Sequence, residues 1–397
     1  MYNRIDSGNR WMIIIGTMLA QLGLGTLYTW SLFNTPLANS HGWTLENVVL
    51  SFSITSFSLA IGTLFAGKLQ DIFGIKLVVA VCGIILGLGL FSAPRVNSLW
   101  ELYISAGVIV GLVNGIGYIM TLSNCIKWFP DKKGMISGIS IGCYGLGSLI
   151  FKYVNSALLR NYGVRDAFMY WGIIAFLLVF IGALFLKDAP ITSLMQRSNT
   201  GKEYRWYELF KSPQAYLLFI AFFASCLSGL YLIGTAKNIG VLFAKLDPIM
   251  AGNAVAIVAI FNTLGRWILG SISDKIQRTK VSAFAFFLII IGVAILLFVP
   301  LDINMFTIAI ACIAFAFGGN LTVFPAVVGE YFGLENHSKN YSVIYQGFGI
   351  GGLLGGVIAQ IMGGFKPTFW VMLFVAAIAF LIMVFIKAPN DRAIRWN

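Results

Sequence analysis

Three basic residues lie inside strongly apolar segments of this chain. Lys152 occurs in SLIFKYVNSALL, Lys237 in GLYLIGTAKNIGVLF and Arg266 in AIVAIFNTLGRWILG. All fifteen Asp and Glu residues fall in expected loops, tails or segment ends, so no acidic side chain is expected at the same depth. Because a charge at the centre of a membrane helix costs at least about 2.5–3.5 kcal/mol, it is seldom retained without a partner. A bound anion is the natural partner for these cations.

These segments belong to a chain with the composition of an integral membrane protein. Its residues are 58% hydrophobic and 11% charged, and its mean hydropathy is +0.86. Apolar runs of about 20 residues recur, which is the length that a helix needs to cross the hydrocarbon core. We expect an all-α integral membrane fold with twelve transmembrane helices, over 11–33, 46–66, 76–93, 100–124, 135–158, 167–187, 214–243, 250–272, 280–300, 303–326, 340–363 and 367–387.

The net charge of +12 follows the expected membrane topology and does not indicate a nucleic-acid partner. If both termini are cytoplasmic, most Lys and Arg residues outside the spans lie on the cytoplasmic side, as the positive-inside rule requires. The five cysteines fall within or at the ends of spans and show no paired ligand spacing. We therefore expect neither a metal site nor a disulfide framework.

The chain also contains an internal repeat. GKLQDIFGIK follows the second expected span and GSISDKIQRTK follows the eighth, so Asp71 and Asp274 occupy matching positions six helices apart. We expect an N-terminal six-helix bundle over 1–187, a basic cytoplasmic linker over 188–213 and a C-terminal six-helix bundle over 214–397. This organisation is typical of rocking-bundle transporters, which hold their substrate between the halves near the membrane midplane.

The first repeated loop resembles the signature of the major facilitator superfamily, Gly-x-Leu-x-Asp-x-x-Gly-x-Lys/Arg. The matching residues are Gly67, Leu69, Asp71, Gly74 and Lys76. Ile72 departs from the signature, because the family usually has a basic residue there. The resemblance implies that Gly67, Asp71 and Asp274 act in conformational gating, with each aspartate facing a helix N-terminus in one conformation only. A simple loop-capping role is the alternative.

A closer resemblance, to the oxalate/formate antiporter family, covers nearly the whole chain. It is carried by GTLYTWSLF, GYIMTLSNCIKWFPDKKG, GGNLTVFPAVVGEYFG and KNYSVIYQGFGIGG. Within that family the chain looks most like the pyruvate (monocarboxylate) transporter branch, which shares YTWSLF, TLSNCIKWFP and GLGS-x-x-FK. The resemblance implies a multi-pass protein of the bacterial cytoplasmic membrane that transports small carboxylates without a cofactor.

Arg266 is the first candidate for a substrate-binding residue. In the resembled family an arginine of the eighth helix, four residues before the glycine that opens the next loop, pairs with the substrate carboxylate, and Arg266 and Gly270 have this spacing. A guanidinium group suits the task because it donates two parallel hydrogen bonds to one carboxylate. The alternative is an arginine that bonds helix-end carbonyls or snorkels to the surface.

The other candidates are one cation and four tyrosines. Lys152 shares a helix face with Tyr144 and Ser148, at i, i+4 and i+8, so it either lines a hydrated cavity or snorkels to the interface. Snorkelling is favoured for Lys237. Hydroxyl groups for a short organic anion are expected from Tyr28, Tyr118, Tyr144 and Tyr345. Each of them can instead be a packing or interfacial residue.

Phe348 is the most informative departure from the resembled family. Its oxalate-exchanging members have a lysine in the eleventh helix, and alignment of YSVIYQGFG places Phe348 there. With a ring in place of the second cation, the site favours a monocarboxylate such as pyruvate. Exchange of dicarboxylates remains the alternative, because Lys152 is able to supply a second charge.

The mode of transport is left open by the sequence. Proton-coupled transporters often use a carboxylate inside the membrane, and none is expected here, so anion exchange, uniport and symport with a proton on the substrate all remain. A carboxylate sensor built on a transporter fold is a further alternative. His41 and His337 are expected in loops on opposite sides, without a nucleophile or metal around them, so we expect no enzyme. The expected partners are a small carboxylate, a proton in the symport case, and the lipid bilayer, with the protein as a monomer.

Overall fold

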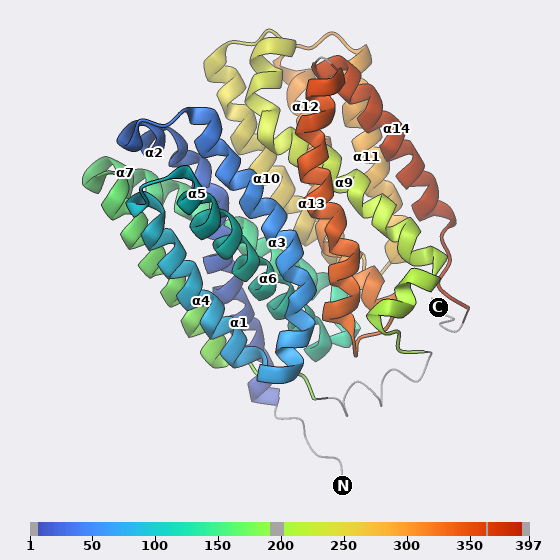
Figure 1. Cartoon of the computed structure of the whole chain (residues 1–397). Helices are drawn as coiled ribbons and strands as arrows, with labels where there is room; N and C mark the ends of the chain where they lie inside the picture. The colour runs from blue at the N-terminus through green and yellow to red at the C-terminus, as the bar shows by residue number, and fades with distance from the viewer. Residues whose placement is uncertain (1–6, 191–201, 363, 391–397) are drawn as a thin grey trace. The chain divides into compact units, whose positions relative to one another are not determined.

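The computed structural model describes residues 7–190, 202–362 and 364–390, and the regular elements in these ranges are all helices (Figure 1). Within them, nine helices are long and apolar enough to cross a membrane. The longest, Pro130–Phe185, contains two of the predicted spans. The two spans meet at Gly163, where the backbone leaves the helical conformation with φ 74°. Together with α10 (Pro248–Ile272) and α13 (His337–Met362), these helices account for each of the twelve predicted spans. The all-α membrane fold is confirmed.

The helices form two compact units. The first unit comprises 1–129 and 140–196, and the second comprises 130–139 and 197–397. The first turns of the fifth predicted span thus group with the second unit. The limits of the two bundles and of the linker stay as predicted from the sequence, and 191–201 of that linker lie outside the described residues.

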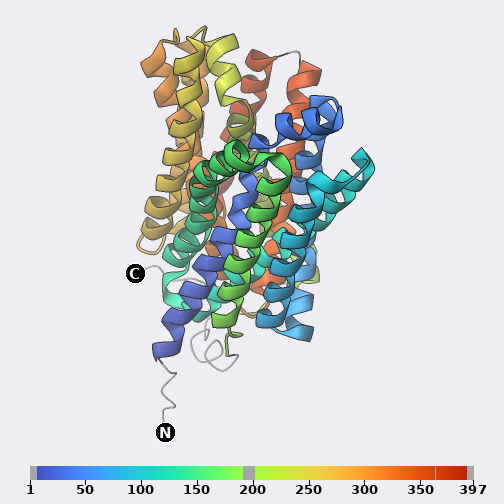
Figure 2. The same ribbon diagram turned by 90° about the vertical axis from the view of Figure 1, so that its left-hand side faces the viewer.

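The first unit is built around α3, which packs along α6, while α1 lies against α6 as well (Figure 2). Large rings pack together where the residue after η1 meets α7, and Phe33 stacks on Trp171 at 4.9 Å. The elements from the N-terminus to α7 are α1 (Ser7–Gly25), η1 (Thr26–Leu32), α2 (Asn34–His41), α3 (Leu45–Phe73), α4 (Ile75–Ser92), η2 (Ala93–Arg95), α5 (Leu99–Leu102), η3 (Tyr103–Ile109), α6 (Val110–Trp128), η4 (Pro130–Lys132) and α7 (Lys133–Phe185).

In the second unit α10 packs along α12, and α9 packs along α13. Helix α11 lies between α12 and α14, with which it makes its main contacts. Besides α10 and α13, the elements of this unit are η5 (Trp206–Lys211), α9 (Pro213–Asn238), η6 (Ile239–Phe243), α11 (Arg278–Phe298), α12 (Ile303–Tyr331) and α14 (Phe365–Phe385).

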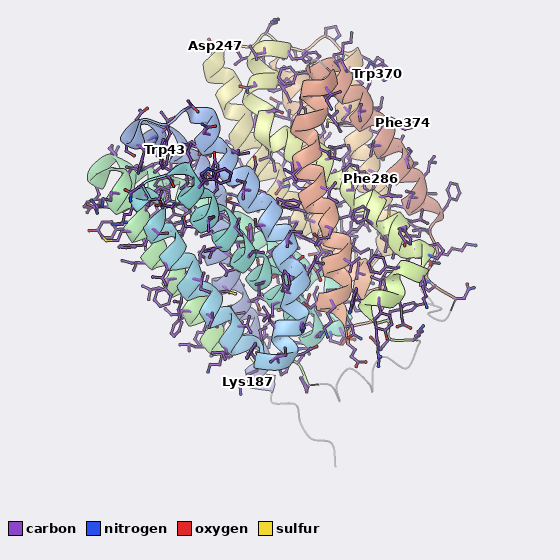
Figure 3. All side chains as sticks on the ribbon, viewed as in Figure 1. Trp43, Lys187, Asp247, Phe286, Trp370 and Phe374 are labelled. Atoms are coloured by element: carbon purple, nitrogen blue, oxygen red, sulfur yellow. The ribbon has the colours of Figure 1, made fainter. Side chains whose placement is uncertain are left out.

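The outward-facing side chains of these helices are apolar. Trp370 and Phe374 project away from α14, whereas Phe286 of α11 is completely buried (Figure 3). A soluble monomer rarely exposes large contiguous apolar patches, so such a surface indicates lipid as the surrounding solvent. Polar backbone groups are satisfied inside each helix, as a membrane-spanning segment requires.

The expectation that both histidines lie in loops is wrong. His41 is the last residue of α2. The difference is larger for His337. It does not lie in a loop: it is the first residue of α13, and it is fully buried. Its Nε2 lies 2.8 Å from the Pro325 carbonyl oxygen, and its ring stacks on Tyr341 at 5.9 Å. The difference arises because α12 ends only a few residues earlier, so the chain folds back and the ring packs between the two helices.

Candidate functional site

Three of the predicted tyrosines come together in the first unit. Tyr28 lies in η1, Tyr118 in α6 and Tyr144 in α7. The ring centroid of Tyr144 is 5.2 Å from that of Tyr28 and 5.3 Å from that of Tyr118, both in edge-on geometry. Such pairs are favourable because the positive edge of one ring meets the negative face of the other. Phe52 of α3, which sequence reasoning missed, adds a ring 6.4 Å from Tyr28.

A close approach of two helices holds this cluster together. A Cβ atom on Gly25 would lie 1.9 Å from the carbonyl oxygen of Tyr144, so only glycine fits where α1 meets α7. Tyr28 follows Gly25 by one turn, in the 3₁₀ helix η1. The glycine therefore fixes the place of the Tyr28 ring beside Tyr144.

Asn114 fixes the hydroxyl group of Tyr144. The hydroxyl donates to Asn114 Oδ1 at 2.9 Å, and Asn114 Nδ2 donates to the Leu24 carbonyl oxygen at 2.8 Å. The second bond orients the amide, so its oxygen must face the tyrosine. The proton of Tyr144 is thus engaged inside the unit, so this hydroxyl does not donate to another group in this arrangement.

Lys152 lies two turns further along α7, and its side chain is exposed. Its Nζ is 5.8 Å from the ring centroid of Tyr153, which is 68% exposed. Ser148, the residue between Tyr144 and Lys152 on the predicted face, donates its hydroxyl to the Gly145 carbonyl at 2.7 Å. A cavity-facing role for Lys152 stays a prediction. Lys237 lies in α9, and its side chain is outside the described part of the structure.

Arg266 lies in α10 and is only 4% exposed. This burial argues against the alternative in which its side chain snorkels to a surface. Thr322 of α12 donates its hydroxyl to the Arg266 carbonyl oxygen at 3.2 Å. Because an arginine keeps its proton at any physiological pH, the interior of the second unit contains a permanent positive charge.

Tyr345 and Phe348 form an apolar stack on α13. Their ring centroids are 5.1 Å apart with an angle of 15° between the planes, and each residue is 3% exposed. Phe222 of α9 and Tyr341 extend the group, at 5.7 Å and 5.6 Å from Tyr345. Phe222 was not predicted, since nothing in the sequence distinguishes it from the other phenylalanines of its helix. Phe348 thus lies in a group of four aromatic rings.

Asp274 makes a set of contacts within the second unit. Its carboxylate accepts from the backbone amides of Gly134 and Met135, both at 2.8 Å, at the start of α7. It also accepts from Arg278 Nη2 at 2.8 Å, and Arg278 pairs in turn with Glu330. A carboxylate is stabilised there by the orphan amides and by the positive end of the helix dipole. The predicted contact between this aspartate and a helix N-terminus is therefore present, whereas its gating role stays a prediction.

The matching loop of the first unit is built differently. Asp71 is exposed at the end of α3, and Gly67 is buried in the same helix. The amide at the start of α4, on Ile75, donates instead to Asp188 Oδ2 at 3.1 Å, while Gln70 Nε2 donates to Asp188 Oδ1 at 2.8 Å. Sequence reasoning missed Asp188, because it follows the sixth predicted span and stands 113 residues from Ile75.

Comparisons with known proteins agree with this architecture. The family model described as "Major Facilitator Superfamily" matches residues 13–312 and again 235–395. An uncharacterized MFS-type transporter of Escherichia coli (strain K12), YhjX, is 47% identical over 87% of this chain and 86% of its own length. An oxalate:formate antiporter of Oxalobacter formigenes is 28% identical over 98% of this chain and 94% of its own length.

Among solved structures, that of the proton:xylose symporter XylE is similar to this chain, with a TM-score of 0.78 between the two. The match covers 98% of each chain at 12% identity, so it shows the fold alone. The chain belongs to the major facilitator superfamily, and it is a multi-pass membrane protein that works as a secondary transporter and not as an enzyme.

Proposed function

We propose that this transporter carries small monocarboxylates, pyruvate first among them, across the bacterial cytoplasmic membrane by alternating access. It does so as a monomer with both termini in the cytoplasm. The observation that carries the proposal is the burial of Arg266 in an apolar helix. Desolvating a guanidinium group is costly, and a carboxylate that accepts two of its hydrogen bonds offsets this cost during each transport cycle.

Selection for one carboxylate is supported by the rings around Tyr345 and Phe348. A monocarboxylate presents a charged end to Arg266 and an apolar remainder to such rings. A dicarboxylate would bring a second charge to a surface that cannot hydrate it, and an unpaired buried charge costs several kcal/mol. The Tyr28, Tyr118 and Tyr144 cluster supplies aromatic surface from the first unit, and Asn114 orients the Tyr144 hydroxyl group.

Ligand-induced stabilisation tests this proposal without requiring flux. A ligand that binds only the folded protein raises the free energy of unfolding, by about 2.7 kcal/mol at a hundred times its dissociation constant. The purified protein is heated with pyruvate, lactate, formate, oxalate, malonate or xylose, and its unfolding midpoint is recorded. We expect the monocarboxylates to raise the midpoint most. Stabilisation by the sugar alone, or by no carboxylate, would refute the proposal.

Exchange of oxalate with formate is the second candidate. It is favoured by the exposed ammonium group of Lys152, which is able to provide a second positive charge from the first unit. The similarity to the oxalate:formate antiporter of Oxalobacter formigenes supports this candidate. In the same panel, oxalate would then stabilise the protein as strongly as pyruvate.

We expect a cysteine in place of Lys152 to react with a water-soluble, positively charged thiol reagent, and we expect substrate to slow this reaction. The reason is that the predicted face of α7 is hydrated and lies beside bound substrate. The experiment uses a Cys312→Ser background, because Cys312 is partly exposed whereas the other four native cysteines are buried. Tyr153→Cys is the control, because its exposed neighbouring position belongs to another helix face. Labelling of Lys152→Cys without protection would favour a lysine that snorkels.

We expect Asp274→Asn to slow turnover while substrate affinity changes little. The variant weakens two charge-assisted bonds to the start of α7, worth about 1–2 kcal/mol, so the conformer that is closed on the cytoplasmic side loses roughly tenfold in population. Distances between labels on the cytoplasmic ends of the two bundles would measure this shift. Asp302→Asn is the matched control: Asp302 also caps a helix, accepting from the Met305 amide at 2.7 Å, but it is absent from the repeated loop. An equal shift in both variants would contradict the gating role.

A further inference from the structure

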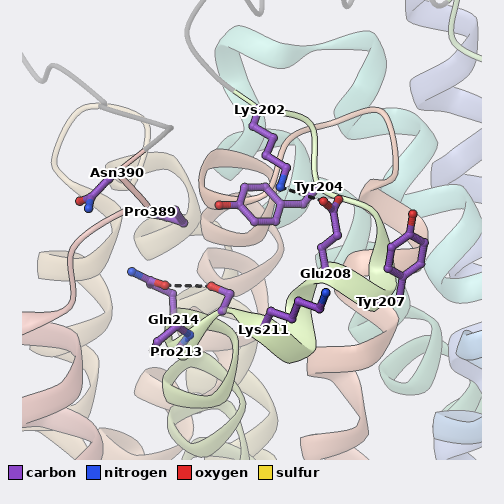
Figure 4. Close-up of a pocket in the computed structure, with 10 residues that line it drawn as sticks. Lys202, Tyr204, Tyr207, Glu208, Lys211, Pro213, Gln214, Pro389 and Asn390 are labelled. Carbon is purple, nitrogen blue, oxygen red and sulfur yellow. Dashed lines mark hydrogen bonds and ion pairs between the residues drawn. The ribbon is translucent and has the colours of Figure 1, made fainter.

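A cavity lies at the first turn of α9, where η5 leads into this helix. Its volume is about 500 Å³, within the range of small-molecule sites. Two parts of the chain line it: residues in and around η5, and Pro389 and Asn390, which follow α14 (Figure 4). Its main lining side chains are Lys202, Tyr204, Tyr207, Lys211, Gln214 and Asn390.

The wall of this cavity is firmly built. The backbone amide of Tyr204 donates to the Phe332 carbonyl oxygen at 3.0 Å, and Asn340 Nδ2 donates to the Tyr204 carbonyl oxygen at 3.0 Å. The Tyr204 ring meets Phe332 edge-on at 5.4 Å, and Leu209 of η5 is buried. These contacts attach η5 to the ends of α12 and α13 and leave its other face outward.

That outward face is aromatic. Trp206 is 48% exposed and Phe210 is 53% exposed, and both extend from η5 just before the first apolar helix of the unit. Tyr216, one turn into α9, is also exposed and donates its hydroxyl to the Phe210 carbonyl at 2.9 Å. Exposed aromatic residues at the end of a membrane helix are typical of the headgroup region of a bilayer.

The charges of the cavity favour an anion. Lys202 Nζ pairs with Glu208 Oε1 at 2.8 Å. The Arg205 backbone amide, followed by Lys202, lowers the pKa of Glu208, so this carboxylate stays ionised and its charge is used within the wall. Among the described residues, no carboxylate lies within ion-pair distance of Lys211. The cavity therefore has an excess of positive charge centred on Lys211.

We propose that this cavity binds the headgroup of an anionic phospholipid, with the phosphate beside Lys211 and the aromatic face of η5 among the upper parts of the acyl chains. The occupant is a lipid rather than a soluble phosphate because Trp206 and Phe210 flank the cavity at the start of a membrane helix. The site is distinct from Arg266 and does not depend on the substrate of the transporter.

Titration of the full-length protein in detergent tests the headgroup part of this proposal. Phosphatidylglycerol, phosphatidylcholine and glycerol 3-phosphate are added separately, and bound molecules are counted by native mass spectrometry. We expect phosphatidylglycerol to bind tightest. Lys211→Gln should weaken it about fivefold, as expected for one basic residue near a lipid headgroup. Lys366→Gln is the matched control, because Lys366 lies at the opposite end of α14 from Asn390.

The outcomes separate the sources of the ligand. Equal binding of phosphatidylcholine, or an equal loss in Lys366→Gln, would overturn the site. Binding of glycerol 3-phosphate as tight as that of phosphatidylglycerol would show a soluble ligand and would overturn the lipid. As a second measurement, vesicles of phosphatidylglycerol with brominated acyl chains should quench a tryptophan component that Trp206→Phe removes. Unchanged quenching in Trp206→Phe would contradict the placement of η5 in the interface.

Discussion

Replacing Arg266 with alanine is expected to abolish pyruvate uptake while the protein still folds and inserts. Breaking a buried pair between an arginine and a carboxylate costs about 3–5 kcal/mol, because it leaves the other charge without a partner. That loss corresponds to roughly two to four orders of magnitude in affinity. Arg266→Lys should recover little, because an ammonium group lacks the planar fork that meets both carboxylate oxygens. Uptake of labelled pyruvate into proteoliposomes measures both variants.

The control for this result is Arg165→Ala, which removes an exposed arginine of α7 and should leave uptake unchanged. Equal amounts of each variant must be shown in the vesicles, and equal unfolding midpoints without substrate exclude a general loss of stability. Near-normal uptake by Arg266→Ala would show that the carboxylate is bound elsewhere.

Replacing Phe348 with lysine is expected to shift the selectivity of the protein from pyruvate toward oxalate. In the proposed site, Arg266 binds one carboxylate of oxalate, and the second carboxylate loses its hydration against the stacked rings of Tyr345 and Phe348. Discrimination of about a hundredfold in favour of pyruvate, which is about 2.8 kcal/mol, is then expected. Phe348→Lys should raise the relative preference for oxalate and weaken pyruvate transport, because pyruvate leaves the new cation without a partner.

Competition of unlabelled pyruvate and oxalate against labelled pyruvate measures this selectivity. Phe348→Leu is the matched control, since it keeps the position apolar and should keep the preference for pyruvate. If the lysine variant does not fold, the ratio in the wild type still decides the matter. Equal competition by oxalate in the wild type would assign the second charge to Lys152.

The helices could be predicted from the sequence because each one is an apolar run of membrane length. The exceptions are local. Gly163 breaks α7 without a polar loop, so its two spans continue directly into one another. His337 begins α13 although the sequence predicts a loop there, and its ring has a carbonyl partner on Pro325. Hydropathy reports the average environment of a segment and not such individual partners.

The candidate site could be predicted only in part. Spacing placed Tyr144, Ser148 and Lys152 on one face, because helix periodicity is a local property. The bond from Tyr144 to Asn114 joins residues 30 positions apart, and the bond from Ile75 to Asp188 joins residues 113 apart. Contacts of this kind depend on which helices are neighbours. A single sequence without a structure does not contain that information.

Monocarboxylate transport through Arg266 is tested most directly by uptake of labelled carboxylates into proteoliposomes that contain the wild-type protein, with and without a pH gradient. We expect saturable uptake of pyruvate, which excess lactate or formate inhibits and which oxalate inhibits about a hundredfold less well. We expect this uptake to be absent in Arg266→Ala. Uptake of oxalate as efficient as that of pyruvate, or pyruvate uptake that persists in Arg266→Ala, would contradict this expectation.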